Sequence, residues 1–256
     1  MTDRRAIGDG SPSPLGPNLA PKPFYVLREL PCPYLPGRQE RKIITDLSGS
    51  DAEDAHSELS RAGFRRSHMF AYRPACRGCD ACVPVRVDTR RHAPSKSQRR
   101  IMRRNADLTV EVAPARASDE QYAVFTRYLA ARHQDGEMAD MSASDYRDMV
   151  EQTAVSTRLA EFRDGARDLI GACIFDLLDD GTSAVYTYFD PAESARSLGT
   201  YTVLWLIDAT RRQWGRYVYL GYWVAGSRKM AYKSRFNGLE RLTPAGWQPF
   251  AGQSQM

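Results

Sequence analysis

Residues 158–223 read RLAEFRDGARDLIGACIFDLLDDGTSAVYTYFDPAESARSLGTYTVLWLIDATRRQWGRYVYLGYW. The first half of this stretch holds three runs rich in β-branched, aromatic and other apolar residues, which are separated by Asp-Gly turns. Short apolar runs bounded by such turns are typical of strands. The pattern therefore predicts a meander of three antiparallel strands, at 158–162, 169–178 and 183–189.

The second half of the stretch changes its period. A turn that contains Gly199 leads into an apolar helix from Thr202 to about Trp214, and a strand follows over 216–223. This order of strands, glycine turn, helix and strand is similar to the GCN5-related N-acetyltransferase core, in which the helix N-terminus receives the donor phosphates. We therefore expect an α+β fold with such a core, built on a mixed, mostly antiparallel sheet with flanking helices. A smaller N-terminal domain would contain most of the cysteines.

The N-terminal part of the chain has a different composition. Eight of the fifteen prolines fall in the first 36 residues, and the opening residues show no apolar periodicity. Such a segment is expected to be a disordered arm. A junction is expected after the basic helix that ends near Asn105. The predicted organisation is an arm over 1–22, an N-terminal domain with the cysteine motifs over 23–105, and an N-acetyltransferase-like domain over 106–256.

Serine caps mark the helices. Each cap stands before residues with helical spacing, and those at Ser50 and Ser118 have Glu or Gln three residues later, which is the signature of a capping box. The predicted helices run from Ser50 to Gly63, from Ser95 to Arg104, from Ser118 to about His133, and over 144–152. Extended segments are expected at 64–76, 83–89 and 108–112.

The composition is that of an ordinary globular protein, with 42% hydrophobic and 26% charged residues among 256. No stretch approaches ~18 apolar residues and no secretion signal opens the chain, so we expect a cytoplasmic protein that does not insert into membranes. The net charge of +5 is concentrated in two runs, 86–104 with eight Lys/Arg and 211–235 with seven. One such run indicates a solvated helix face, whereas two runs on either side of a site indicate a polyanionic partner.

Five cysteines, of which three lie close together, fit reduced thiols or metal ligands better than disulfides. Cys76, Cys79 and Cys82 are spaced so that, with Cys32, they can hold tetrahedral zinc or an iron–sulfur cluster. A second Cys-x-x-Cys pair is missing. A compact turn of reduced, partly buried thiols therefore also explains the motif.

The segment from Arg196 to Tyr201, RSLGTY, is a candidate donor-binding turn. N-acetyltransferases carry Arg/Gln-x-x-Gly-x-Gly/Ala at the corresponding place, because backbone N–H groups close around a pyrophosphate and a small residue lets it approach. Tyr201 stands where the last small residue should be, which argues against the usual pose of coenzyme A. Taken alone, the motif also fits a simple turn into a helix.

Longer motifs give the turn a context. FDPAESARSLGTY from Phe189 and YLGYWVAGSRKMAYKSRF from Tyr219 resemble the aminoacyl-tRNA-protein transferases of the N-degron pathway. The N-terminal motifs agree in order, and the single Cys32 in the first of them is typical of the bacterial branch of the family, which transfers leucine. These motifs are CPYLPGR at 32–38, GFRRS at 63–67, AYRPACRGCDACVPVRV at 71–87 and KSQRR at 96–100.

The resemblance implies an enzyme that transfers leucine from leucyl-tRNA to the N-terminal amine of proteins beginning with Asp or Glu, which marks them for degradation. The implied partners are leucyl-tRNA and these proteins. An aminoacyl ester is already activated, and an α-amine has a reference pKa of ~7.7–8.0, so a neutral fraction exists near neutral pH. The reaction then requires positioning and proton transfer but no cofactor.

Three residues at the end of a predicted strand are candidates for the chemistry. Tyr186, Tyr188 and Asp190 are evenly spaced, so a strand would place them on one face, pointing into the cleft. Asp190 would orient the substrate or act as a base, and the tyrosines would donate hydrogen bonds. The same spacing would arise if the tyrosines were sheet packing before an Asp-Pro turn.

Recognition of an acidic N-terminal residue requires a guanidinium group that can form two parallel hydrogen bonds with its carboxylate. Arg65 and Arg66, together with Tyr72, are the candidates for binding the substrate N-terminus. Because side chains alternate along a strand, only one of the two arginines is expected to face the cleft.

The aminoacyl-tRNA is expected to bind the basic segments and the turn. Four basic residues of the 95–104 helix lie along one side at spacings of three and four. Such contacts to phosphates fix position without reading sequence. The residues expected to bind aminoacyl-tRNA are Lys96, Arg99, Arg100, Arg103, Arg196, Leu198, Gly199, Tyr201, Arg228, Lys229 and Lys233.

Three other functions fit parts of the sequence. The choice of leucine over arginine rests on the resemblance alone, so arginyl transfer stays open. A coenzyme A-dependent acetyltransferase fits the fold, although Tyr201 argues against it. A non-catalytic tRNA-binding protein with a zinc knuckle fits the basic runs and cysteines but leaves the strand, turn, helix and strand order unexplained.

Overall fold

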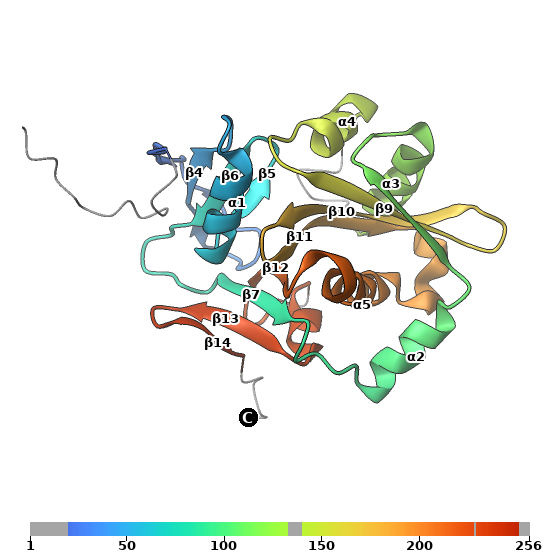
Figure 1. Cartoon of the computed structure of the whole chain (residues 1–256). Coiled ribbons are helices and arrows are strands. Elements are labelled where there is room, and N and C mark those ends of the chain that lie inside the picture. Colours follow the sequence, from blue (N-terminus) through green and yellow to red (C-terminus); the bar gives the residue numbers. More distant parts are fainter. Residues whose placement is uncertain (1–19, 133–139, 228, 251–256) are drawn as a thin grey trace, which may run out of the picture.

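A computed structural model describes residues 20–132, 140–227 and 229–250 (Figure 1). Residues 1–19 of the predicted arm and Arg228 lie outside this part. The largest element is an eight-stranded sheet of order β14-β13-β7-β12-β11-β10-β9-β8, in which every pairing is antiparallel except β11 with β12. The predicted α+β class with a mostly antiparallel sheet is thus confirmed. The strands are β7 Val83–Asp88, β8 Thr109–Pro114, β9 Thr157–Arg163, β10 Leu169–Leu178, β11 Gly181–Phe189, β12 Tyr217–Trp223, β13 Leu239–Thr243 and β14 Gly246–Pro249.

The meander predicted from the sequence is formed by β9, β10 and β11. Side chains of β10 alternate between two hydrophobic cores: Cys173 and Phe175 belong to one, and Ala172 and Ile174 to the other. A strand that is apolar on both faces needs cover on both sides of the sheet. Helices provide that cover.

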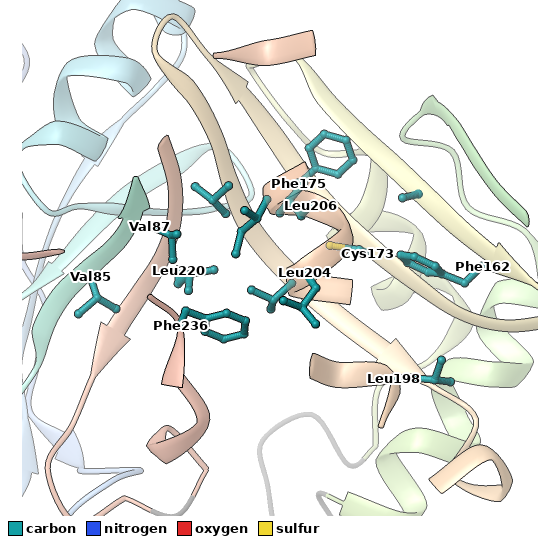
Figure 2. Packing of buried hydrophobic residues seen from close by; sticks show 14 of the residues in the cluster. Val85, Val87, Phe162, Cys173, Phe175, Leu198, Leu204, Leu206, Leu220 and Phe236 are labelled. Carbon is teal, nitrogen blue, oxygen red and sulfur yellow. The ribbon is translucent and has the colours of Figure 1, made fainter. Parts of the chain in front are cut away.

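Each face of the sheet has its own helices (Figures 1 and 2). On one face, α3 (Asp119–Arg132) and α4 (Ala143–Glu151) enclose a core with Phe125, Tyr146 and Tyr188 at its centre. On the other face lies α5 (Leu198–Ala209), which continues as a π-helical turn over Thr210–Trp214. Figure 2 shows Leu204 and Leu206 of α5 close to side chains of β10 and β12, whereas Leu198 at the start of the helix lies apart from them. The basic helix α2 (Lys96–Arg104) packs against α5.

Two of the predicted serine caps are confirmed and one is wrong. Ser95 and Ser118 each exchange hydrogen bonds with the Gln three residues later, at the starts of α2 and α3. No capping box forms at Ser50, because α1 begins after Asp51 and that residue makes no side-chain cap bond. The Asp51 carboxylate instead accepts a hydrogen bond from Lys22 Nζ at 3.1 Å.

A second, four-stranded sheet of order β1-β4-β6-β5 carries α1 (Ala52–Arg61). Residues 64–76 were expected to be one extended segment, but they form a hairpin of β5 and β6. The chain reverses at His68, whose φ of 52° is in the left-handed region. The short strands of this part are β1 Tyr25–Val26, β2 Leu30–Pro31, β3 Gln39–Glu40, β4 Lys42–Asp46, β5 Arg65–Ser67 and β6 Phe70–Pro74.

Strand β7 connects the N-terminal part to the large sheet. It lies between β12 and β13, although it precedes them by more than a hundred residues. The sheet therefore contains strands from both sides of residue 105, and the domain boundary expected there stays a prediction. In the described part of the chain, no helix is long and apolar enough to cross a membrane.

Candidate active site

The parallel strands β11 and β12 separate along their length. They pair only from Gly181 and Tyr217 to Ser183 and Tyr219, although both strands continue further. At the paired end the backbones are so close that a Cβ on Gly181 would overlap the Tyr217 carbonyl. Beyond it, backbone groups that strand pairing would satisfy need other partners. We call the region between 184–189 of β11 and 221–223 of β12 the wedge.

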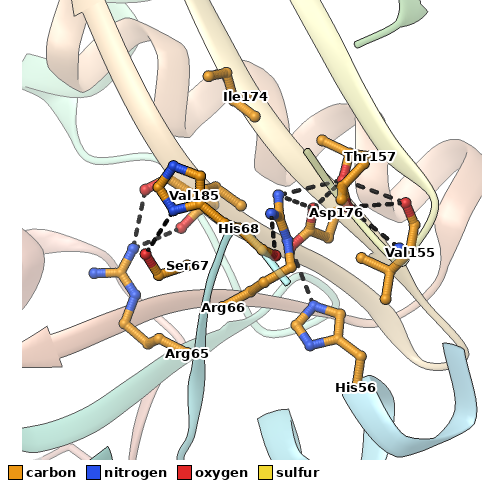
Figure 3. Close-up of polar contacts among 12 residues, drawn as sticks. His56, Arg65, Arg66, Ser67, His68, Val155, Thr157, Ile174, Asp176 and Val185 are labelled. Atoms are coloured by element: carbon orange, nitrogen blue, oxygen red, sulfur yellow. Dashed lines mark hydrogen bonds and ion pairs between the residues drawn. The ribbon is translucent and has the colours of Figure 1, made fainter. Parts of the chain in front are cut away.

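Arg65 of β5 reaches the β11 side of the wedge (Figure 3). Its Nη2 donates to the carbonyl oxygens of Ala184 and Val185 at 3.1 and 3.0 Å. On the β12 side it lies against Gly221, where a Cβ would come within 2.5–2.6 Å of the Arg65 side chain. Gly221 has a φ of 72° at an irregularity in the β12–β7 pairing. Glycine is required there for both its conformation and this close approach.

Lys233 lies beside β12 and is only 5% exposed, so it is not part of an open basic surface, and its predicted contact with aminoacyl-tRNA stays a prediction. It belongs to the short helix η3, Ala231–Arg235. Its Nζ donates to the Tyr222 carbonyl at 2.7 Å and to Met230 Sδ at 3.4 Å. Burial, followed by the charge of Arg65, holds the pKa of Lys233 well below its ordinary value.

Arg66 points away from Arg65, as strand alternation requires, and is only 4% exposed. Its Nε and Nη2 donate to the two carboxylate oxygens of Asp176 at 2.7 and 2.8 Å. His56 Nε2 lies 3.1 Å from the same carboxylate, and the Thr157 hydroxyl donates to it at 2.7 Å (Figure 3). Burial opposes ionisation of Asp176, but the Arg66 charge and the hydrogen bonds outweigh it and lower its pKa. Arg66 is thus committed to fastening β5 to β10 and is not free to bind a substrate carboxylate.

Tyr72 and Tyr222 border the wedge from the N-terminal side. Tyr72 is the pairing partner of Arg65 in the β5–β6 hairpin, and the Tyr222 hydroxyl lies 3.1 Å from the Tyr72 carbonyl. Both residues line a cavity of about 60 Å³. Burial raises the pKa of Tyr34, which also lines the cavity, to about 12. The remaining lining includes Arg38, Glu40, Lys42, Cys32, Cys76, Cys79 and Cys82.

The four cysteines of the predicted metal site therefore share one cavity, and all are free thiols. Burial raises the pKa of Cys82 to about 11, which favours its protonated form. Within residues 20–132, 140–227 and 229–250, no group of three or more His, Cys, Asp or Glu is placed to hold a metal ion. The zinc or iron–sulfur site stays a prediction.

The predicted catalytic face of β11 is not an open cleft. Tyr188 is completely buried beneath α3, with its hydroxyl 2.5 Å from that of Tyr146, so the expectation that it points into a cleft is wrong. Asp190 caps the following turn and forms an ion pair with Arg127 at 2.7 Å. The buried hydroxyl of Tyr186 has no hydrogen-bond partner among the described residues.

The predicted donor-binding turn joins the end of η1 to the first turn of α5, which begins at Leu198 rather than Thr202. Leu198 is 2% exposed, and Tyr201 packs edge-on against Phe162. A Cβ on Gly199 would lie 3.2 Å from the Phe189 ring. The side chains of Leu198 and Tyr201 therefore pack in the core. The small size of Gly199 is explained by its close contact with the Phe189 ring.

Helix α2 is fixed at both ends next to this region. Gln98 Nε2 donates to the Arg235 carbonyl of η3 at 3.2 Å, and Asn105 Nδ2 donates to the Arg196 carbonyl at 3.0 Å. Arg196 closes the turn η1 (Pro191–Arg196), and its guanidinium forms ion pairs with Asp107 and Glu193. The Arg196 side chain is thus a brace between η1 and the segment after α2. The predicted basic residues with exposed side chains are Lys96, Arg99, Arg100, Arg103 and Lys229.

Family models match both halves of this arrangement. The model "Arginine-tRNA-protein transferase, N terminus" matches residues 30–100, and "Arginine-tRNA-protein transferase, C terminus" matches residues 120–243. The chain belongs to this family. It is an enzyme, an aminoacyl-tRNA-protein transferase, and the resemblance of its motifs is confirmed.

Curated relatives of this transferase are similar along nearly their whole length. Proteins named aspartate/glutamate leucyltransferase from Paramagnetospirillum magneticum and Rhodospirillum rubrum are 52% and 51% identical, over 89% and 92% of this chain and 93% and 96% of theirs. Another from Parvibaculum lavamentivorans is 53% identical over 88% of this chain and 93% of its own. Among solved structures, L-PGS from Bacillus licheniformis has a TM-score of 0.44 at 12% identity and covers 68% of this chain and 52% of its own. FemX has a TM-score of 0.45 at 9% identity and covers 74% of this chain and 65% of its own. Both TM-scores are too low to assign a fold.

Several residues of this site were not predicted from the sequence. Gly221 stands alone inside a strand pattern, which is a recognised signal for a bulge or a close backbone approach. Asp176 is a single charge in a buried apolar strand, which signals a buried partner. The burial of Lys233 had no such signal, because a lysine in a basic run is normally exposed.

Proposed function

We propose that this transferase moves leucine from leucyl-tRNA to the α-amine of proteins that begin with Asp or Glu, and so marks them for degradation in the cytoplasm. The observation that carries the proposal is identity of about 50% over nearly the full length of relatives with that name. The exposed basic face of α2, fixed beside η1 and η3, gives the donor a surface next to the wedge. The proposed partners are thus leucyl-tRNA and acidic N-termini.

We further propose that the core is of the GCN5-related N-acetyltransferase type. The order of β9, β10, β11, α5 and β12, with β11 and β12 parallel and separating after three residues, supports this assignment. In such a core the aminoacyl end of leucyl-tRNA would lie at the wedge, near the start of α5. The exposed N–H groups of a helix start favour a negatively charged or polar ligand.

The proposed chemistry is attack of the neutral α-amine on the ester carbonyl of leucyl-tRNA. A C–N bond forms, the bond to the ribose oxygen breaks, and the amine proton passes by way of a proton acceptor to the leaving oxygen. Because the ester is already activated, alignment of the two substrates supplies most of the acceleration that the enzyme must provide. Tyr186 and Asp190 stay candidates for proton transfer, although Asp190 is held by Arg127.

Within this proposal, Arg65 contacts the acidic side chain of the acceptor protein, and Tyr72 lines the path by which the acceptor N-terminus reaches Arg65. Arg65 is the arginine of the pair that reaches the wedge, whereas Arg66 is committed to Asp176. For the donor, the exposed residues of α2 and Lys229 would track the phosphates of the acceptor arm. Gly199 would admit the aminoacyl end.

The test is a transfer assay with the purified full chain. Leucyl-, arginyl- and phenylalanyl-tRNA are offered as donors to peptides that differ only in their first residue: Asp, Glu or Ala. We expect ribonuclease-sensitive transfer of leucine to the Asp and Glu peptides. Equal transfer to the Ala peptide would refute the acceptor specificity, and faster transfer of arginine would identify the enzyme as an arginyltransferase.

A further inference from the structure

Two basic side chains, the half-buried Arg65 and the buried Lys233, border the wedge on opposite sides. Arg65 donates to carbonyl oxygens of β11 and lies against Gly221, whereas Lys233 donates to the carbonyl of the next residue, Tyr222. Each side chain thus donates to a backbone carbonyl beside the wedge, one on β11 and the other on β12.

These two basic side chains differ from the buried arginines of the described residues. Arg66 pairs with Asp176, and Arg86 pairs with Glu240. Neither Arg65 nor Lys233 forms an ion pair with a carboxylate of the described residues. A charged amine that is buried close to another positive charge is costly unless an anion compensates it, and carbonyl oxygens compensate only part of a charge. The wedge is therefore arranged to receive an anion.

The anion must be small. Lys233 is enclosed by η3 and β12, so a phosphodiester, whose charge lies on a bulky polymer backbone, fits this position poorly. A carboxylate at the end of a short side chain fits better. The cavity of about 60 Å³ lies next to the two basic groups and not between them: it is lined by Tyr72, the pairing partner of Arg65, and by Tyr222, to whose carbonyl Lys233 donates.

We propose that Lys233 and Arg65 together bind the side-chain carboxylate of the acceptor's N-terminal Asp or Glu, and that Lys233 determines this specificity. The inference rests on the proposed function and adds a second cation to it. Arg65 alone cannot offer a complete fork, because its Nη2 is already engaged with the Ala184 and Val185 carbonyls. Lys233 supplies the missing donor from the other side.

The test compares Lys233→Gln with the parent on two peptides that differ only in an N-terminal Asp or the isosteric Asn. Gln keeps a donor for the Tyr222 carbonyl and removes the charge. With leucyl-tRNA saturating, we expect the Asp:Asn ratio of kcat/KM to fall by about 10- to 100-fold, the range for loss of one charge-assisted hydrogen bond. The exposed Arg241→Gln, with the same change of charge, should keep the parent ratio.

Other outcomes distinguish failure of the proposed function from failure of the inference about Lys233. If the parent transfers leucine to neither peptide, the proposed function fails. If the parent prefers Asp and Lys233→Gln keeps that preference, only the inference about Lys233 fails. A rise in the KM for leucyl-tRNA with an unchanged Asp:Asn ratio would assign the cation to a donor phosphate and overturn the proposal. Lys233→Met is a second variant if Lys233→Gln does not unfold cooperatively, and the same reading applies to it.

Discussion

At the scale of single residues, the position of Arg65 depends on Gly221. The arginine comes from the N-terminal sheet and can enter the wedge only because β12 presents a residue without a Cβ at this point. The same glycine adopts a φ of 72°, which other residues adopt at a cost. Any side chain at this position would therefore have two effects, backbone strain and displacement of Arg65.

We predict that Gly221→Ala lowers kcat/KM for Asp-peptides by about 10- to 100-fold, because displacing a substrate-positioning group by ~1 Å can cost ~100-fold in rate. The control is Gly246→Ala. Gly246 has a φ of 91° and no atom within 4 Å of its Cβ position, so it carries the strain without the close approach. The measurement is the kinetics of leucine transfer by each variant to the peptides with an N-terminal Asp or Asn. Equal reductions in the two variants would show that strain alone is responsible.

At the scale of elements, the exposed face of α2 is the proposed donor surface. Arg100 and Arg103 are exposed, and their side chains have no hydrogen bond or ion pair to another described residue. We predict that Arg100→Glu with Arg103→Glu raises the KM for leucyl-tRNA about 10-fold or more. The slope that relates the logarithm of the binding constant to the logarithm of the salt concentration should decrease by about one unit for each phosphate that is no longer neutralised.

The control for α2 is Arg147→Glu on α4, which makes half the change in charge at an exposed arginine of a helix that covers the opposite face of the large sheet. It should leave both the KM for leucyl-tRNA and the salt dependence close to those of the parent. An effect half as large as that of the double variant would mean that net charge, and not the α2 surface, governs tRNA binding.

The attachment of β5 to β10, which belong to different sheets, depends on the buried ion pair between Arg66 and Asp176. We predict that Asp176→Leu alone lowers the free energy of unfolding by about 3–5 kcal/mol, because it leaves a buried unpaired guanidinium. Arg66→Met with Asp176→Leu should recover most of that stability, since an apolar pair of similar volume is often as stable. Chemical denaturation measures both variants. No recovery in the double variant would mean that His56 and Thr157 contribute more than the ion pair.

The elements that the sequence predicted best are those whose interactions are local. The β9–β10–β11 meander, the Ser95 and Ser118 caps and the basic helix depend on neighbouring residues, so their patterns were visible. The insertion of β7 between β12 and β13 depends on long-range pairing and left no such trace. Lys233 shows the same limit for the site, because its burial is decided by η3 folding against β12.

At the scale of the whole molecule, the ion pair of Arg66 with Asp176 ties the N-terminal sheet to the large one and links stability to pH. The folded-state pKa of Asp176 lies below its unfolded value, which is ~3.9. The carboxylate therefore contributes stability at pH values above about 4, and this contribution disappears as the pH falls further. We predict that the difference in unfolding free energy between the parent and Asp176→Asn is constant from about pH 5 to 7 and shrinks below about pH 4. A difference that does not change with pH would contradict the assignment of the buried charge.

A competition in one reaction distinguishes leucyl from arginyl transfer and acidic from neutral acceptors at the same time. Leucyl- and arginyl-tRNA carrying different isotopes are offered together to an equimolar mixture of Asp- and Ala-initiated peptides, and mass spectrometry locates the added residue. We expect leucine at the N-terminus of the Asp peptide and little on the Ala peptide. Equal labelling of the two peptides, or arginine as the main product, would contradict it.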